Sequence, residues 1–251
     1  MTVRSRYVNG VAESYDDFTQ EIVETTAAVF FSDDFIGPSH AGGVPASATT
    51  GYNWVKKIVG AAPPTVAVLS SAGAGIAQLA LTSTSEKQDA VLYSADALNW
   101  DMTKNAVFEA RIALTVPPSA AGVQVVFGLA AAWIDGPDNN TRYVEFGCTA
   151  NANLLVRTQD GVTQNSIAAA QIGGSPIVLD TNFHIFRIRA VGANGDLEFS
   201  FDGNRVNAVN SVAFTKVDAT AILQPYVACY KPSGTGVATL QVDKLQMSMG
   251  R

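Results

Sequence analysis

The sequence contains few charged residues and only two cysteines. Only 15% of its 251 residues are charged and 47% are hydrophobic, which is enough apolar surface for a folded core and too little charge for disorder. The net charge is −6 and the sequence has no basic stripe, so nucleic acid and anionic membranes are disfavoured as partners. Cys148 and Cys229 form neither a CxxC pair nor a disulfide framework, and each lies in an apolar stretch typical of a buried strand.

Long apolar runs are also missing from the sequence. No stretch reaches the ~18 apolar residues of a membrane-spanning helix, and the N-terminus lacks the apolar segment of a secretory signal. We therefore expect a protein that is made in a cytoplasm and not secreted. Gly73-Ala74-Gly75 is not followed by the Lys-Ser/Thr of a phosphate loop, and no metal motif is present, so no cofactor and no metal are expected.

The most informative stretch is residues 183–206, where two strands of alternating apolar and polar residues flank a turn at 192–195. Asp202-Gly203 then forms a second tight turn. A meander with one apolar and one polar face is typical of an antiparallel sandwich. The alternation predicts four side chains buried between the sheets: Phe186, Ile188, Phe199 and Phe201.

Alternating patterns recur along most of the chain after Val29. They predict strands at 29–36, 54–59, 66–69, 76–81, 90–94, 106–116, 123–132, 141–148, 153–159, 183–191, 196–201, 205–209, 223–230 and 237–248. This favours an all-β fold, a two-sheet antiparallel sandwich that spans residues 29–251. In the last strand the apolar parity changes after Val242, which predicts a β-bulge near Asp243-Lys244.

Residues 1–28 differ in composition and are predicted to form an N-terminal arm with one short amphipathic helix. Ser14 and Asp17 resemble a capping box, and a helical apolar stripe follows from Tyr15, Phe18, Ile22 and Val23. A helix of about 12 residues is marginal alone in water, so it needs a surface to lie on. That surface is either its own sandwich or a neighbouring subunit or assembly, to which Arg4 and Arg6 would add contacts.

Three motifs resemble the concanavalin-like (laminin-G-like) jelly rolls. They are the meander at 183–206, the opening Ser32-Asp33-Asp34-Phe35 and the closing Leu240-Gln241-Val242-Asp243-Lys244-Leu245. The resemblance covers roughly residues 29–249 and implies a jelly roll whose first and last strands pair. The Ala/Gly/Val-rich composition, the short arm and the free cysteines also resemble bacteriophage virion proteins of the capsid decoration and head fibre type.

The second resemblance implies a structural virion protein that decorates or projects from a phage capsid. It would be anchored by the arm to capsid or other virion proteins and would form a homo-oligomer, a trimer being the first expectation. The alternative is a glycan-binding, lectin-like module of a phage surface or tail protein. In that case a host-surface glycan would stack on exposed aromatic residues, for which the candidates are Tyr52, Trp54, Trp100 and Trp133.

An enzyme is not expected, although glycoside hydrolases of the laminarinase type share the fold. Those enzymes carry paired carboxylates on an E-x-D-x-x-E strand, which this sequence lacks. The nearest arrangement is Asp196, Glu198 and Asp202, on a strand whose polar face has no aromatic residue to hold a sugar. These carboxylates are therefore interpreted as a solvated face.

Two further groups of residues are assigned structural roles. His184 shares the parity of core residues and is expected to be a buried neutral imidazole, whereas His40 lies in a Gly-rich loop and is expected to be exposed. Asp33, Asp34 and Asp243 would approach one another where the first and last strands pair, which leaves open a structural Ca²⁺ near Asp34 and Asp243. A turn-forming role is favoured for them.

Overall fold

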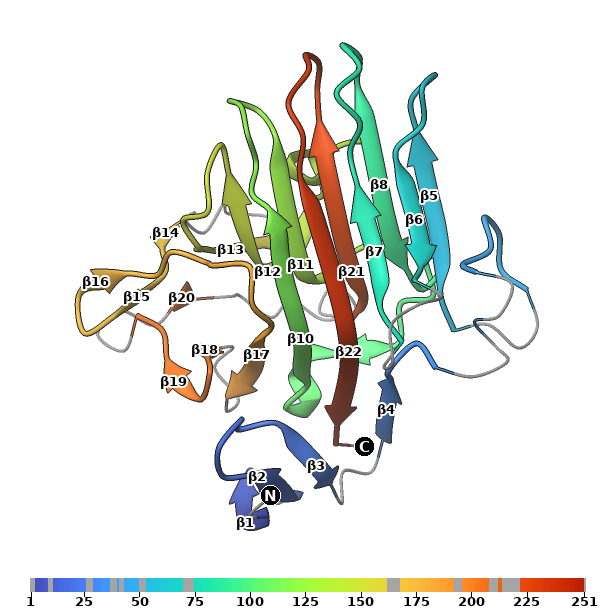
Figure 1. Ribbon diagram of the computed structural model, residues 1–251. Coiled ribbons are helices and arrows are strands. Elements are labelled where there is room, and N and C mark those ends of the chain that lie inside the picture. Colours follow the sequence, from blue (N-terminus) through green and yellow to red (C-terminus); the bar gives the residue numbers. More distant parts are fainter. Residues whose placement is uncertain are drawn as a thin grey trace.

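Figure 1 shows the computed structural model of the protein, with two large β-sheets and a small three-stranded sheet at the N-terminal end. The structure describes residues 3–8, 11–25, 29–36, 40, 43–49, 53–69, 75–161, 168–191, 196–207, 212–213 and 222–250. Helical structure within these residues is limited to short 3-10 turns, among them η2 (Met102–Lys104) and η3 (Pro137–Asn139). No described helix is long and apolar enough to cross a membrane.

The first large sheet has nine described strands. They are β4 (Val29–Asp33), β6 (Thr65–Val68), β7 (Ala77–Ala80), β10 (Val107–Val116), β17 (His184–Val191), β18 (Asp196–Phe201), β19 (Asn204–Arg205), β20 (Val212–Ala213) and β22 (Thr239–Met249). Their order is β19-β18-β17-β10-β22-β7-β6, with β20 beside β18 and β4 beside β22.

The second large sheet has eight described strands. They are β5 (Val55–Val59), β8 (Gln88–Tyr93), β9 (Trp100–Asp101), β11 (Gln124–Ala130), β12 (Arg142–Thr149), β13 (Leu155–Asp160), β14 (Ala168–Ala169) and β21 (Ile222–Lys231). Their order is β14-β13-β12-β11-β21-β8-β5, with β9 beside β21. A separate two-stranded ladder pairs β15 (Gln171–Ile172) with β16 (Ser175–Pro176).

The predicted all-β sandwich is confirmed, and each long strand overlaps a range predicted from the period-2 pattern. The predicted pairing of the first and last sandwich strands is also present, because β4 runs antiparallel to β22 with Asp33 opposite Leu245. The bulge is confirmed as well, since Arg111 lies opposite Lys244 while Ile112 lies opposite Val242. Asp243 is therefore the extra residue that returns the following apolar side chains to the core.

The core lies between the two large sheets and contains a cluster of phenylalanine rings. Phe186 packs edge-on against Phe127 at 4.7 Å and against Phe146 at 5.3 Å between ring centroids. Phe199 meets Phe146 at 5.1 Å. The predicted core residues Phe186, Ile188 and Phe199 are buried, whereas Phe201 is partly buried and packs against the core.

Both cysteines are buried in this core, as predicted. Burial raises the pKa of the Cys148 thiol to about 12 and also raises the pKa of Cys229, because a thiolate is poorly solvated there. Neither thiol is therefore a nucleophile at neutral pH.

The predicted N-terminal helix is wrong. The chain instead forms three antiparallel strands, β1 (Val3–Val8), β2 (Val11–Asp16) and β3 (Ile22–Thr25), which we call the N-terminal sheet. Asp16 Oδ1 accepts hydrogen bonds from the N–H groups of Phe18 and Thr19, both at 2.8 Å, and so folds a turn. Gln20 follows with a left-handed φ of 62°, which ends any helix.

The interpretation of Ser14 and Asp17 as a capping box fails for the same reason. The Ser14 hydroxyl lies 3.3 Å from the Ser5 hydroxyl of the paired strand, and Asp17 forms an ion pair with Arg4 at 2.9 Å. The apolar residues that follow helical spacing are thus divided between strands and a turn. Cross-strand pairing and a local turn outweigh a weak helical pattern at this position.

Candidate functional site

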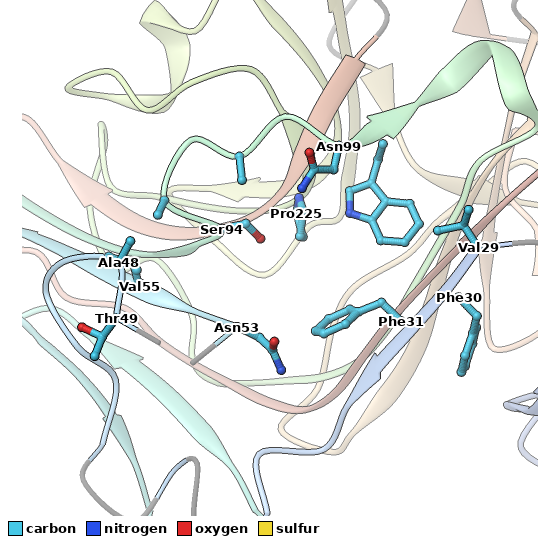
Figure 2. Close-up of a pocket in the computed structure, with 13 residues that line it drawn as sticks. Val29, Phe30, Phe31, Ala48, Thr49, Asn53, Val55, Ser94, Asn99 and Pro225 are labelled. Atoms are coloured by element: carbon cyan, nitrogen blue, oxygen red, sulfur yellow. The ribbon is translucent and has the colours of Figure 1, made fainter. Parts of the chain in front are cut away.

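A cavity of about 690 Å³ opens at the end of the sandwich where β4 and β5 begin and β8 ends. We call it the aromatic cavity, and Figure 2 shows its lining. Ring side chains are contributed by Phe30, Phe31, Trp100 and Pro225, and polar side chains by Thr49, Asn53, Ser94 and Asn99. The remaining lining residues are aliphatic: Val29, Ala48, Val55, Ala95 and Ala97.

A proline in β21 explains why the chain opens at this point. The pairing of β21 with β8 ends at Tyr226, opposite Tyr93, and resumes with β9 at Leu223, opposite Trp100. Between these pairs lies Pro225, which has no N–H to donate to a ladder. The segment 94–99 therefore leaves the sheet and forms one wall of the cavity.

Asp96 fixes that wall to the sheet. Its backbone N–H donates to Gln224 Oε1 at 3.0 Å, and its Oδ1 accepts from Gln224 Nε2 at 2.9 Å and from the backbone N–H of Trp133 at 2.6 Å. Ala95 and Asp96 both have a left-handed φ, of 55° and 61°. Such conformations persist only where surrounding contacts enforce them, so the wall is held in a defined shape.

The opposite wall is organised by the buried carboxylate of Asp33 at the end of β4. Asp33 Oδ2 accepts from Trp54 Nε1 at 2.8 Å, and both of its oxygens lie within 3.1 Å of His40 Nε2. Phe31 packs against the Trp54 ring at 5.7 Å between centroids. Figure 2 shows the Phe31 ring pointing toward Asn53, across the cavity from Ser94 and Pro225.

The lining combines apolar rings with neutral hydrogen-bonding groups. None of the cavity's described lining residues carries a charge. Phe31 is partly buried and its ring points into the cavity, whereas Trp100 is 8% exposed and forms part of the cavity wall (Figure 2). Phe30 is 45% exposed, but it lies on the opposite face of β4 from Phe31 and its ring points away from Asn53. The amides of Asn53 and Asn99 each offer donors and an acceptor to a polar ligand.

The four predicted glycan-contact residues are not gathered in one place. Trp100 lines the aromatic cavity, whereas Trp54 is 1% exposed and donates its indole N–H to Asp33. Trp133 lies on the outer face of the second large sheet, with Lys57 Nζ 4.5 Å from its ring centroid. Tyr52 lies outside the described residues. The sequence pattern did not single out Phe30, the asparagines or Pro225, because only the break in the ladder brings them together.

The predicted apolar docking residues also separate. Ile22 is 3% exposed and faces the sandwich, whereas Phe18 is 95% exposed at the turn between β2 and β3. Tyr15 is half-buried, and the Val23 side chain lies outside the described part of the chain. These residues therefore do not form a single stripe.

The two arginines of the predicted arm form ion pairs within the N-terminal sheet. Arg4 pairs with Asp17 at 2.9 Å, and Arg6 Nε donates to Glu13 Oε2 at 3.0 Å. The Arg6 guanidinium also lies over the Tyr15 ring, 4.6 Å from its centroid. Docking of either arginine to another protein stays a prediction.

Both histidine predictions are wrong. His184 is half-buried between two carboxylates, with Nδ1 2.7 Å from Asp202 Oδ2 and Nε2 2.9 Å from Asp180 Oδ1. The hydrogen bond to Asp202 is the main reason that the pKa of His184 is raised, so its charged form is favoured. His40 is buried and not exposed, because its imidazole lies against the carboxylate of Asp33.

The carboxylates that were candidates for Ca²⁺ do not converge. Asp33 binds Trp54 and His40, while Asp243 forms an ion pair with Arg111. Asp34 Oδ1 accepts a hydrogen bond from the backbone N–H of Ile36 at 3.3 Å. In the described ranges, no three His, Cys, Asp or Glu side chains are placed to hold a metal ion.

The carboxylates of β18 are also engaged by neighbours. Glu198 pairs with Arg189 and, at 3.3 Å, with Arg205. Asp202 holds His184 and accepts from the N–H of Ile185 at 2.8 Å. The Asp196 side chain lies outside the described residues. This face of the strand is therefore an ion-paired surface.

The outer face of the second large sheet holds ionisable groups that are almost fully buried. Burial raises the pKa of Asp89 to about 7 and the pKa of Glu145 to about 7, and it raises the pKa of Tyr226 well above its usual value. Arg157 is fully buried beside Glu145, with Nε 3.3 Å from Glu145 Oε1. Segment 131–140 contacts this face, since Trp133 Nε1 donates to Asp89 Oδ2 at 3.3 Å.

Comparisons with known proteins establish the fold. No protein-family model and no curated protein matches the chain. Among solved structures, a Shewanella oneidensis protein of unknown function shares 12% identity at a TM-score of 0.57, over 88% of this chain and 85% of that one. The carbohydrate-recognition domain of Emp47p shares 11% identity at a TM-score of 0.52, over 82% and 91%. A carbohydrate esterase of the Shiga toxin-encoding bacteriophage phi24B shares 14% identity at a TM-score of 0.50, over 83% and 97%.

These similarities, at low identity, concern the fold alone. The protein is a concanavalin-like β-sandwich, as the sequence motifs implied. Its activity has to be argued from its own residues.

Proposed function

We propose that the protein binds a neutral glycan in the aromatic cavity. The observation that carries this proposal is the lining, in which rings lie beside amides and hydroxyls and no lining residue is charged. A pyranose presents an apolar face that packs on aromatic rings and a rim of hydroxyls that hydrogen-bond to amides. Phe31 supplies a ring that points into the cavity, and Asn53 and Asn99 supply the amides.

The size and neutrality of the cavity narrow the ligand class. Its volume of about 690 Å³ lies within the roughly 300–1,000 Å³ that is usual for small-molecule sites. A ligand of one to a few sugar residues fits this range. Because no lining residue is charged, an acidic sugar would lose hydration there without gaining a counter-charge.

Two of the solved structures with this fold support a carbohydrate ligand. One is named as a carbohydrate-recognition domain and the other as a carbohydrate esterase of a bacteriophage. Low identity prevents any transfer of their residues to this chain. The likeness nevertheless favours the glycan-binding alternative over the capsid role that the sequence first suggested.

A glycan array followed by calorimetry with the selected sugar tests the proposal. Phe31→Ala should weaken binding at least tenfold, the equivalent of about 1.4 kcal/mol, because a stacking ring is lost. Asn53→Ala and Asn99→Ala should each weaken it several-fold. Phe18→Ala is the matched control, since Phe18 is 95% exposed and does not line the cavity.

The virion role, the trimer and the absence of enzymatic activity stay predictions. A protein that binds no arrayed glycan and yet binds phage particles would favour the structural virion role. A protein that binds both would be the glycan-binding module of a phage surface or tail.

A further inference from the structure

A second cavity, of about 180 Å³, lies where the N-terminal sheet meets β17, β18 and β19. Four arginines line it: Arg6, Arg187, Arg189 and Arg205. We call it the arginine cavity. The chain has nine arginines in all and a net charge of −6, so this concentration of positive charge runs against the composition of the whole molecule.

Strand register explains the hollow. Ser200 of β18 lies opposite Arg187 on one side and opposite Arg205 on the other. Its short side chain leaves a space between two long ones. Gly203 lets the chain approach the N-terminal sheet closely, because a Cβ at that position would collide with the Gln20 side chain.

Carboxylates neutralise only part of this charge. Arg187 Nε donates to Glu109 Oε2 at 2.6 Å, and Arg6 pairs with Glu13. Arg189 and Arg205 share the single carboxylate of Glu198, which is the one carboxylate among the cavity's described lining residues. Four guanidinium groups thus face three carboxylates, and a guanidinium stays charged at any pH that the folded protein experiences.

One donor in the group has no partner. The Nη2 atom of Arg6 is buried and makes no hydrogen bond to any described residue. A buried charged donor is usually satisfied by protein, water or a ligand. Arg6 belongs to β1 and lines the cavity, so a ligand bound beside its side chain would bridge the N-terminal sheet and the sandwich.

We propose that the arginine cavity binds a tetrahedral oxyanion, a phosphate or sulfate group. Guanidinium forks match the oxygens of such groups, and the excess positive charge favours an anion. At about 30 Å³ for each water molecule, the cavity of about 180 Å³ has room for one oxyanion with bound water. The site is independent of the glycan proposal, because it shares no lining residue with the aromatic cavity.

The test is calorimetry with sodium sulfate and sodium phosphate against sodium chloride at equal ionic strength. The expected result is saturable binding of sulfate or phosphate that weakens as chloride rises, since screening shortens the range of the charges. Arg205→Gln should reduce the affinity at least tenfold. Arg111→Gln is the matched control, because its side chain is 38% exposed on the same sheet, pairs with Asp243 and does not line the cavity.

Both variants change partly exposed arginines, 49% exposed for Arg205, and should keep the far-UV spectrum of the parent protein. Equal loss of affinity in the two variants, or no saturable binding, would overturn the proposal. A second arm uses glucose 6-sulfate. Binding of the sulfated sugar that is lost in Arg205→Gln would support the site and identify an ester as the source of the anion, whereas failure of every oxyanion would reject it.

Discussion

The outer faces of the two large sheets are stabilised by different means. On the second sheet the face, which we call the apolar face, is buried: an apolar cluster that includes Val91, Tyr93, Val126 and Tyr226 packs outside the main core, with Trp133 against it. Its ionisable groups, among them Asp89 and Glu145, are buried as well. On the first sheet the face is charged, and Glu109 and Lys244 hold the N-terminal sheet by hydrogen bonds. Burial of apolar side chains therefore stabilises the outer face of the second sheet, and pairing of charged groups stabilises that of the first.

The difference teaches that the two faces respond to different conditions. Carboxylates buried on the apolar face have raised pKa values, so its stability depends on pH near neutrality. The Lys244–Glu21 ion pair on the charged face is about a quarter exposed, so its contribution to stability depends on salt. Four predictions test this contrast, from the largest expected effect to the smallest.

Removing the buried counter-charge on the apolar face should have the largest effect. At pH 8, above the pKa of Glu145, Arg157→Leu leaves an ionised Glu145 buried without its cation, which typically costs about 3–5 kcal/mol of unfolding free energy. Urea unfolding measures this loss. Arg111→Leu, a change to a partly exposed arginine of the other sheet, should cost less than about 1 kcal/mol. Equal costs for the two variants would remove the contrast between the faces.

Acidification should stabilise the protein between about pH 8 and pH 5. The pKa of Asp89 and that of Glu145 are each about 7 in the folded state because of burial, above their values in the unfolded chain. The folded protein therefore binds more protons in this window, and its stability falls as pH rises, by up to about 1.4 kcal/mol per pH unit for each group.

The raised pKa of His184 acts in the same direction, so the double variant Asp89→Asn with Glu145→Gln isolates the carboxylates. Urea unfolding at several pH values should show a flatter profile for the double variant than for the parent. Stability that rises with pH in the parent protein would contradict the assignment of buried carboxylates.

Glu109 is the central group of the charged face, and its loss should have an intermediate effect. Its carboxylate accepts from the Ile22 N–H at 3.0 Å, from Arg187 Nε at 2.6 Å and from Gln246 Nε2 at 2.6 Å. Glu109→Gln replaces a charged acceptor by a neutral amide and should cost about 1–3 kcal/mol. Amide hydrogen exchange should show faster exchange at Ile22.

Glu198→Gln, on the same face but not bonded to the N-terminal sheet, should stay within about 0.5 kcal/mol of the parent and leave Ile22 exchange unchanged. If Glu109→Gln behaves like this control, the N-terminal sheet is not held through Glu109.

Loss of the Lys244 ion pair should have the smallest effect. Lys244 Nζ donates to Glu21 Oε1 at 2.7 Å, and both side chains are about a quarter exposed. Lys244→Ala should cost about 0.2–1 kcal/mol at low salt, and the difference from the parent should shrink in 1 M sodium chloride. A cost that is independent of salt would mean that packing and not charge makes the contact.

The sequence predicted the sandwich because most of its strands have one apolar and one polar side. Phe186 and Phe199 are such cases, and both lie in the core. In β8, β11 and β21 the apolar residues occupy both parities, and β8 is buried at all six positions. This pattern is typical of strands that are covered on both faces. It could have predicted the apolar cluster on the outer face of the second sheet.

The candidate site was less predictable. Trp100 was identified as an aromatic residue, but no pattern distinguishes it from Trp54, whose indole N–H is committed to a buried carboxylate. The helix predicted for the N-terminal region was wrong for a related reason. The Asp16 turn and the contacts of Ile22 with the sandwich are set by tertiary structure, which a helical periodicity of four residues does not encode.

The most direct test of the central claim is a crystal structure of the protein with the sugar that the glycan array selects. We expect the sugar in the aromatic cavity, with one ring face on Phe31 and hydroxyls bonded to Asn53 and Asn99. A sugar bound elsewhere on the sandwich, with the aromatic cavity occupied by solvent alone, would contradict the account.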